Sequence, residues 1–182
     1  MEVLDAINGR RSIRKYKSKQ VPKEIIEKLL DAAVMAPSAV NRQPGNFIII
    51  EDKKKISDLS KAVKKNLGLL GYAIQAREKI QSKEDTIFYG APLLIIVTAE
   101  KEYKWAKIDC GILAQTMFLA AHSMGLGSCY IGFATSLNND KDVLRELEVP
   151  KGHEIIAPLI FGYPDEAKDK PDRRPKIVRW LR

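Results

Sequence analysis

Leu93-Leu94-Ile95-Ile96-Val97 decides the fold class of this sequence, because an extended strand over these five residues is apolar on both of its faces. A strand of that kind belongs to a sheet that helices cover on both sides. Three further segments read as strands: 46–50, 127–132 and 155–161. Four strands separated by helical segments predict a single domain, α+β or α/β, with three layers over residues 1–182.

Helical segments fill the intervals between these strands. A helix is expected over residues 22–35, because Pro22 suits the first helical position and apolar residues recur behind it at helical spacing. Other helices are expected near the N-terminus, over 53–79 with Gly68 and Gly71 as candidate breaks, and from a cap at Asn138 or Asn139 to Leu147. Residues 105–123 are apolar nearly all round, which predicts a helix buried centrally or at a subunit contact.

The composition is that of an ordinary globular chain. The 182 residues are 45% hydrophobic, which excludes an intrinsically disordered protein, and 11 glycines and 9 prolines exclude a collagen-like one. Cys110 and Cys129 have no second pair at metal-ligand spacing, so neither a disulfide scaffold nor a metal site is expected. This cysteine usage fits a cytoplasmic protein.

The sequence gives no sign of export or membrane insertion. The N-terminal segment carries Glu2 and Asp5 where a signal peptide would have a basic region followed by an apolar one. The longest apolar stretch, residues 110–121, contains Gln115 and Thr116 and is shorter than the roughly 20 residues that a membrane span needs. A soluble protein is therefore expected.

Motifs that would place the chemistry on the protein's own side chains are missing. Gly125, Gly127 and Gly132 lead from a helix into a strand, which reverses the order of a dinucleotide-binding fingerprint. A Cys–His pair that used Cys129 is conceivable, but a small buried thiol in a core strand is the preferred interpretation. The chemistry is therefore expected to reside in a bound cofactor, with no catalytic side chain.

The net charge of +8 has two interpretations. Lysines in residues 52–65 are interleaved with acidic residues, as on a solvated helix face, but a basic nucleic-acid-binding module is the competing hypothesis. The arginines gather instead near the two ends of the chain, as Arg10, Arg11 and Arg14 and as Arg173 and Arg174. Two separated arginine groups suit one phosphate bound between the chain ends better than a long polyanion.

Four segments, taken in order, carry a family resemblance. They are Arg10-Arg11-Ser12-Ile13-Arg14-Lys15-Tyr16, Ala36-Pro37-Ser38-Ala39-Val40-Asn41-Arg42-Gln43-Pro44, Gly127-Ser128-Cys129-Tyr130-Ile131-Gly132 and Asp172-Arg173-Arg174-Pro175. Together they resemble the nitroreductase family of FMN-dependent oxidoreductases over nearly the whole chain. The resemblance implies a three-layer α/β/α sandwich of the α+β class with a mostly antiparallel sheet. It also implies a homodimer with FMN at the subunit interface.

The resemblance assigns the N-terminal arginines to the flavin. Arg10 and Arg173 fall at the FMN phosphate, and Arg11 and Ser12 fall at the phosphate and the ribityl chain. Arg14 falls beside the N1 and O2 edge of the flavin, where a guanidinium favours the anionic reduced state.

Further positions surround the flavin ring in the family pattern. The residues expected to contact the flavin from the partner subunit are Pro37, Ser38, Ala39 and Asn41. Ile131 and Gly132 match a strand end whose backbone approaches flavin N5, which a glycine permits. Asn66 matches an asparagine that bonds to the ring.

The implied reaction is a ping-pong oxidoreduction: NAD(P)H passes a hydride to flavin N5, and a nitroaromatic, quinone or similar small acceptor then takes the electrons. A flavin-holding protein without turnover is the alternative, and no nucleic-acid or membrane partner is implied. The sequence departs from the family at Gly45-Asn46, where an aromatic residue usually follows Gln-Pro. In the variable region 67–89, Tyr72, Phe88 and Tyr89 are candidates for lining the substrate pocket.

Overall fold

The centre of the molecule is an antiparallel sheet. The computed structural model describes residues 1–69, 77–78 and 80–181. In this part of the chain, β1 (Asn46–Ile50), β2 (Leu93–Glu100), β3 (Gly127–Tyr130) and β4 (His153–Gly162) form one sheet of order β1-β2-β4-β3. Every neighbouring pair is antiparallel, which confirms an α+β fold with the expected sheet.

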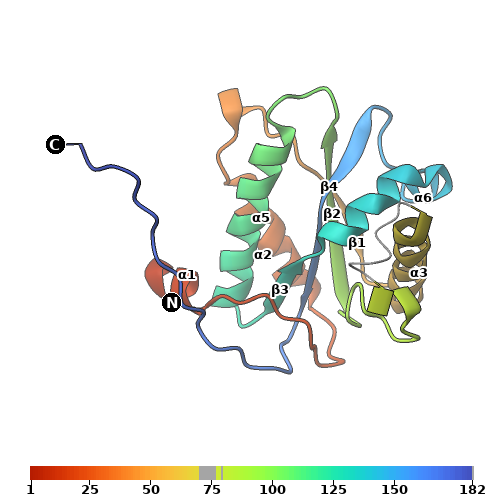
Figure 1. Cartoon of the computed structure of the whole chain (residues 1–182), viewed down its shortest axis with the longest axis horizontal. Helices are drawn as coiled ribbons and strands as arrows, with labels where there is room; N and C mark the ends of the chain where they lie inside the picture. The colour runs from red at the N-terminus through yellow and green to blue at the C-terminus, as the bar shows by residue number, and fades with distance from the viewer. Residues whose placement is uncertain (70–76, 79, 182) are drawn as a thin grey trace.

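Helices cover both faces of this sheet (Figure 1), because β2 is apolar on both of its faces. Leu93, Ile95 and Val97 lie in one core with α2 (Lys23–Val34) and α5 (Ala106–Ser123). Leu94 and Ile96 lie in the opposite core with α3 (Lys53–Leu69), the 3-10 segment η2 (Gly132–Asn139) and α6 (Lys141–Glu146). The alternation of β2 side chains therefore produces the expected three layers.

The helix cap predicted at Asn138 or Asn139 is wrong. Asp140 caps α6, because its carboxylate accepts hydrogen bonds from the backbone N–H groups of Asp142 and Val143 at 3.2 Å each. Asn138 instead bonds both backbone groups of Ile155, at 2.8 and 2.9 Å, and so ties η2 to β4.

Two other helix boundaries differ slightly from the prediction. Pro22 precedes α2 rather than forming its first residue, since the helix begins at Lys23. α3 continues through Gly68 to Leu69, and the second candidate break, Gly71, lies outside the described residues.

The third strand is shorter than predicted, because β3 ends at Tyr130. Tyr130 pairs with Leu159, so the next residue, Ile131, faces Pro158. The Ile131 N–H donates to the Pro158 carbonyl at 2.9 Å, but proline has no N–H to complete a further ladder bond. The chain therefore leaves the sheet at Ile131 and turns into η2 at Gly132, which is where the site residues of this strand end are expected.

Segments from both ends of the chain meet beside β3 and β4. Ser12 forms an isolated parallel bridge with Ser128, and the Ile13 N–H donates to the Ser128 carbonyl at 3.0 Å. Tyr16 bridges to Pro164 just after β4. In Figure 1 the C-terminal tail then runs past α1 (Val3–Gly9) and away from the body of the molecule.

Ile13 reaches the sheet only because Gly127 has no side chain. A Cβ atom on Gly127 would lie 2.8 Å from both Cβ and Cγ1 of Ile13. We therefore expect Gly127→Ala to lower the free energy of unfolding by about 1–3 kcal/mol, since overpacking forces the N-terminal segment off β3.

Urea unfolding followed by circular dichroism measures this difference. Gly68→Ala is the matched control, because a Cβ there meets nothing within 4 Å and alanine favours a helix. An equal loss in both variants would contradict the contact with Ile13 as the cause.

Candidate functional site

The N-terminal arginines and the C-terminal tail line one cavity of about 620 Å³. The polar residues around it are Asn8, Arg10, Arg11, Ser12, Lys170, Asp172 and Arg173. The structure therefore brings together the four residues predicted to bind a phosphate, although about 160 positions separate Arg10 from Arg173.

The cavity is lined by four cationic residues and one acidic residue, Asp172, which pairs with Arg174. Within the described chain, the ion-paired arginines are Arg42, Arg145 and Arg174. Of these, Arg174 belongs to the arginine groups near the chain ends, whereas Arg10, Arg11 and Arg173 form no ion pair among the described residues. Burial lowers the pKa of Arg10, and the like charges of Arg173 and Arg11 lower it further. Crowded guanidinium groups of this kind form a site for an anion, because an anion would relieve their mutual repulsion.

The C-terminal end of α5 lies beside these guanidinium groups. His122 lies in the last turn of that helix and packs against Gly9, where a Cβ would come 2.4 Å from its Nε2. Burial lowers the pKa of His122, and the charges of Arg10 and Arg11 lower it further. The imidazole is therefore mainly neutral at pH 7 and leaves the anion site to the guanidinium groups.

The C-terminal segment holds the N-terminal segment by hydrogen bonds to its backbone. The Glu166 carboxylate accepts from the Arg14 N–H at 2.5 Å, and the Lys168 ammonium donates to the Ser12 carbonyl at 2.8 Å. Lys168 also pairs with Glu166 at 3.1 Å, and Arg11 Nε donates to the Asp169 carbonyl at 2.9 Å. Sequence reasoning missed Glu166 and Lys168, because each bonds to the backbone of a segment more than 150 positions away and so leaves no local pattern.

A second cavity, of about 500 Å³, lies at the end of β3. It is lined by Arg14, by Ile131 and Gly132, and by the aromatic residues Tyr89, Tyr130 and Phe133. The Arg14 guanidinium lies over the Tyr89 ring, 5.9 Å from its centroid, and the Tyr130 hydroxyl donates to the Ile156 carbonyl. The cavity therefore combines one cation with aromatic walls, and the sequence-predicted residues Arg14, Ile131 and Gly132 meet there.

The other predicted flavin contacts lie at the far end of α5. Pro37 and Ser38 line a small separate cavity, and Ala39 and Asn41 form the 3-10 turn η1 (Ala39–Asn41). The Ala39 N–H contacts Asp109, which lies thirteen positions before His122 on α5. At 1.5 Å per residue this separation is about 20 Å, so one protomer does not bring the two groups together. The assignment of the 37–41 segment to a partner's flavin stays a prediction.

Asn66 lies away from both cavities. Its side chain is 5% exposed, and its amide donates to the Ser136 carbonyl at 3.3 Å. The predicted contact with the flavin ring therefore stays a prediction, with the amide nitrogen directed to η2.

The variable region contributes one residue to the second cavity. Tyr89 lines it, whereas Phe88 is fully buried in the core beneath α3, and Tyr72 lies outside the described residues. At the departure from the family pattern, a Cβ on Gly45 would lie 2.8 Å from a methyl group of Leu113. Leu113 therefore occupies the space that a side chain at position 45 would enter.

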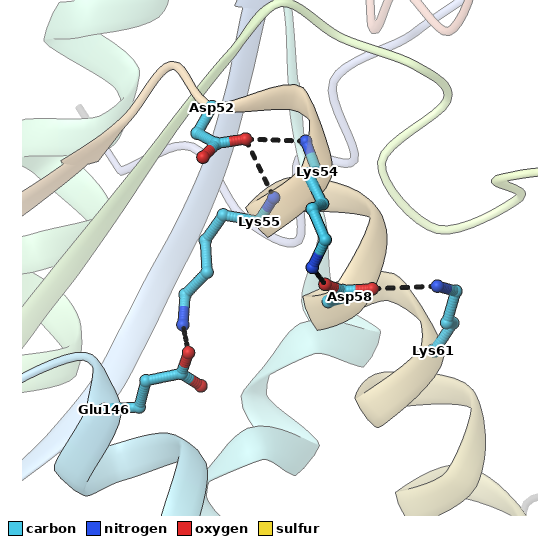
Figure 2. Close-up of polar contacts among 6 residues, drawn as sticks. All are labelled: Asp52, Lys54, Lys55, Asp58, Lys61 and Glu146. Carbon is cyan, nitrogen blue, oxygen red and sulfur yellow. Dashed lines mark hydrogen bonds and ion pairs between the residues drawn. The ribbon is translucent and has the colours of Figure 1, made fainter.

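The lysine-rich helix α3 forms a salt-bridged surface, as Figure 2 shows. Asp58 pairs with Lys54 and Lys61 at 2.8 Å each, and Lys55 pairs with Glu146 on α6. Hydrogen bonds from Lys54 and Lys61 lower the pKa of Asp58 to about 2. This pairing fits the solvated helix face and gives the nucleic-acid hypothesis no free basic track at these lysines.

Neither cysteine has the surroundings of a nucleophile. Cys129 is 2% exposed and lies 3.5 Å from the Tyr130 carbonyl. Burial raises the pKa of Cys110 to about 11, with a further contribution from the charge of Asp109. Within the described residues, no group of three or more His, Cys, Asp or Glu side chains is placed to bind a metal, and no helix is long and apolar enough to cross a membrane.

Comparison with known proteins identifies the family. The sequence profile of the nitroreductase family matches residues 7–163. The chain belongs to the nitroreductase family. The match ends before the tail, so the position of Arg173 in the cavity is a finding of the structure and not of the family profile.

Solved and curated nitroreductase relatives resemble the chain over most of its length. A crystal structure of a nitroreductase with bound FMN from Bacteroides fragilis is 30% identical, covers 100% of this chain and 98% of its own, and superposes with a TM-score of 0.85. An FMN reductase [NAD(P)H] from Bacillus subtilis is 30% identical over 96% of this chain and 71% of its own length. A 4-nitrobenzoate reductase from Pseudomonas putida is 26% identical over 88% and 84%.

Glu166 makes the hold on the arginine segment dependent on pH. Burial raises the pKa of Glu166, but the hydrogen bonds from Arg14 and Lys168 outweigh burial and bring it below the usual 4.5. A carboxyl with a lowered pKa contributes stability above its unfolded-state pKa and loses it as the pH falls through the folded-state value. We therefore expect Glu166→Gln to unfold at lower urea concentration than the wild type at pH 5 to 7, and the difference to shrink below pH 4.5.

Urea unfolding at pH 7, 5, 4 and 3 tests this expectation. The control is Glu27→Gln, because the Lys23–Glu27 pair is exposed and 3.6 Å long and contributes little. A difference between Glu166→Gln and wild type that grows as the pH falls would reverse the sign and refute the role of Glu166.

Proposed function

We propose that this chain is an FMN-dependent oxidoreductase that uses NAD(P)H as its electron donor. The observation that carries the proposal is the cluster of Arg10, Arg11 and Arg173 around one cavity, where cations outnumber the single acidic residue, which fits the phosphate of a mononucleotide. The bound FMN of the Bacteroides fragilis nitroreductase supports this choice of anion.

The extended segment from Arg10 to Arg14 would hold the cofactor along its length. Four residue steps span at most about 14 Å, so a single elongated ligand can reach from the first cavity into the second. Arg10, Arg11, Ser12 and Arg173 would bind the phosphate end of FMN. Ile131 and Gly132 would bring backbone close to the ring. The space beside Gly132 is open, because the atom nearest to a Cβ built there belongs to the Tyr130 ring and lies 4.0 Å away.

The chain's own contribution to the reaction is electrostatic and positional. Bound FMN would supply the redox chemistry, accepting a hydride from NAD(P)H and delivering electrons to a second substrate in ping-pong order. Arg14 would place a guanidinium beside the ring edge that gains negative charge, and Tyr89 holds that guanidinium in place. No side chain of the site needs to act as a general acid.

The walls of the second cavity favour a planar aromatic or quinone acceptor. Tyr89, Tyr130 and Phe133 offer flat apolar surfaces, and Arg14 offers one positive charge. The relative named 4-nitrobenzoate reductase supports a nitroaromatic acceptor. A protein that holds flavin without turnover is the alternative, and bound FMN that neither NADH nor NADPH reduces would establish it.

A homodimer would complete this site. The helix α5 exposes Ile108 (55%) and Ile112 (38%) on one face, although it is buried on the other. The helix α1 and the tail also expose apolar side chains, namely Val3, Leu4, Ile7, Val178 and Trp180. Exposed apolar surface of this extent marks a protein interface. A two-fold axis beside α5 would bring the 37–41 segment of one protomer to the arginine cluster of the other, across the 20 Å that separates them within one chain.

The cofactor assignment predicts that Arg10→Ala and Arg173→Ala each weaken FMN binding about 10- to 100-fold. Removing a charged hydrogen bond to phosphate costs about 1.5–3 kcal/mol, which corresponds to that range. The measurement is quenching of FMN fluorescence on titration with flavin-free protein. Arg145→Ala is the control, because Arg145 pairs with Asp142 on the exposed surface of α6.

The same protein tests the reaction. Purified protein loaded with FMN should be yellow, and its flavin absorbance should bleach when NADH or NADPH is added without oxygen. A protein that binds no FMN when supplied with it, or an Arg10→Ala variant that binds as tightly as the wild type, would refute the proposed function.

The dimer predicts that Ile112→Glu shifts the protein toward monomer and weakens FMN binding at the same time. A charged side chain at the apolar face of α5 would be desolvated in the interface. Sedimentation velocity gives the oligomeric state, and FMN titration gives the affinity. Leu69→Glu is the matched control, since Leu69 is 77% exposed on α3 in the opposite layer. Loss of the dimer with unchanged FMN affinity would show that one protomer holds the whole site.

A further inference from the structure

Asp109 is a buried carboxylate that the proposed chemistry does not use. It lies in the first turn of α5 and is 5% exposed. Among the described residues no cation pairs with it, and its hydrogen-bond donors are the Ala39 N–H (3.2 and 3.3 Å to its two oxygens) and the Tyr103 hydroxyl (2.9 Å). Burying a carboxylate without a cation is costly, so these two bonds and the positive end of the helix must offset the cost.

The segment that Asp109 holds has an unusual backbone. Val40 has φ 49° and ψ 28°, and Asn41 and Gln43 also have positive φ, at 53° and 50°. The left-handed region strongly disfavours a β-branched residue, so Val40 requires other contacts to keep it there. Its own side chain supplies none within the protomer, because it is 95% exposed.

The contacts that fix the segment converge on Ala39. Its N–H is bound by Asp109, and its carbonyl lies 3.3 Å from the Tyr103 hydroxyl, which shares its single proton between this carbonyl and Asp109. The Tyr103 ring is in turn stacked under the Arg42 guanidinium, whose carbon lies 4.7 Å from the ring centroid, and Arg42 pairs with Glu100 at 2.7 Å. Asp109 and Tyr103 thus bond to both backbone groups of Ala39, its N–H and its carbonyl, directly before the strained residue Val40.

Local bonds close the turn but do not anchor it to the body of the protein. Ser38 Oγ accepts from the Gln43 N–H at 2.9 Å, and the Gln43 side-chain amide donates to Asn41 Oδ1 at 3.0 Å. These bonds join residues of the turn to one another. The Arg42–Glu100 pair ties the end of the turn to β2, and the bonds from Asp109 and Tyr103 fix its start, at Ala39, relative to α5.

We propose that Asp109 is a positioning residue, which holds Ala39 and the left-handed turn at Val40 so that Ser38, Ala39 and Asn41 meet the flavin of the partner protomer. The inference rests on the proposed function, since that places the 37–41 segment at a flavin. The inference goes beyond the proposed function, because it names a residue that does not touch the cofactor and a strained turn that this residue holds in place.

Four variants of the full-length protein separate positioning from general stability. Asp109→Ala removes both bonds, whereas Asp109→Asn keeps an acceptor oxygen for the Ala39 N–H and a donor for the Tyr103 oxygen. Tyr103→Phe removes only the hydroxyl. Val40→Gly in the Asp109→Ala background relieves the strain, because glycine adopts positive φ without a steric penalty. Asp31→Ala, an exposed acid on α2, is the control.

Three measurements are made on each variant: FMN affinity, the visible circular dichroism of the bound flavin, and hydrogen exchange over residues 36–44. We expect Asp109→Ala to weaken FMN binding at least tenfold, alter the flavin band and lose protection at the Ala39 and Gln43 amides. Asp109→Asn should stay within about threefold of wild type, and Tyr103→Phe should fall between the two. Adding Val40→Gly to the Asp109→Ala variant should raise its FMN affinity at least threefold.

Two outcomes would overturn the proposal. Unchanged exchange and affinity in Asp109→Ala and Tyr103→Phe would show that the turn needs neither bond. Loss of protection throughout α5 and the sheet, with no recovery by Val40→Gly, would show that Asp109 acts only on overall stability.

The proposed function and this inference fail in different ways. If the wild-type protein binds no FMN, the proposed function fails, and the assigned role of Asp109 toward a flavin fails with it. If the wild type binds FMN, and the Asp109 and Tyr103 variants bind it with the same affinity and show the same hydrogen exchange, the inference fails and the proposed function stands.

Discussion

The close approach of Ile13 to Gly127 is the contact on which the position of the arginines depends. It lets an extended N-terminal segment lie beside the start of β3, where Ser12 bridges to Ser128. With Ile13 buried against the sheet, Ser12 and Arg14 on either side of it line the two cavities. The C-terminal segment then binds the same stretch from outside, through Glu166 and Lys168. The contact of the Ile13 side chain with Gly127 thus determines where both cavities form.

The helix α5 acts as the spacer of the molecule. Its C-terminal end packs beside the arginine cluster through His122, and its N-terminal end holds the turn at Ala39 through Asp109. The exposed face between the two ends carries Ile108 and Ile112. The expected burial of this helix is therefore realised on one side only, and the proposed dimer would cover the other. In that arrangement α5 would separate the arginine cluster from the 37–41 segment within one protomer, and would bring the cluster of one protomer to the segment of the other across the dimer interface.

Local sequence patterns predict the layers of this fold well, and they predict its boundaries less well. The two apolar faces of Leu93–Val97 were sufficient to predict a sheet covered by helices on both sides, because a strand buried on both faces shows no alternation of apolar and polar residues. The end of β3 was missed, since it depends on Pro158, a residue that faces Ile131 only in the folded sheet. The cap of α6 was misassigned among three neighbouring residues that all suit a cap, and the choice was made by the bonds of Asn138 to Ile155. For the site, the family resemblance indicated the arginines, but Glu166 and Asp109 were missed because each acts on a distant backbone group.

The joining of distant segments in the anion cavity also sets an order of events during synthesis on the ribosome. Arg10, Arg11 and Ser12 emerge early, and Arg173 emerges about 160 residues later, after all four strands of the sheet. The sheet and both of its cores can therefore form while the cavity still lacks one of its walls. The proposed capture of a phosphate by all three guanidinium groups would have to wait until translation has passed the final strand, so cofactor loading would be a late step in the maturation of this protein.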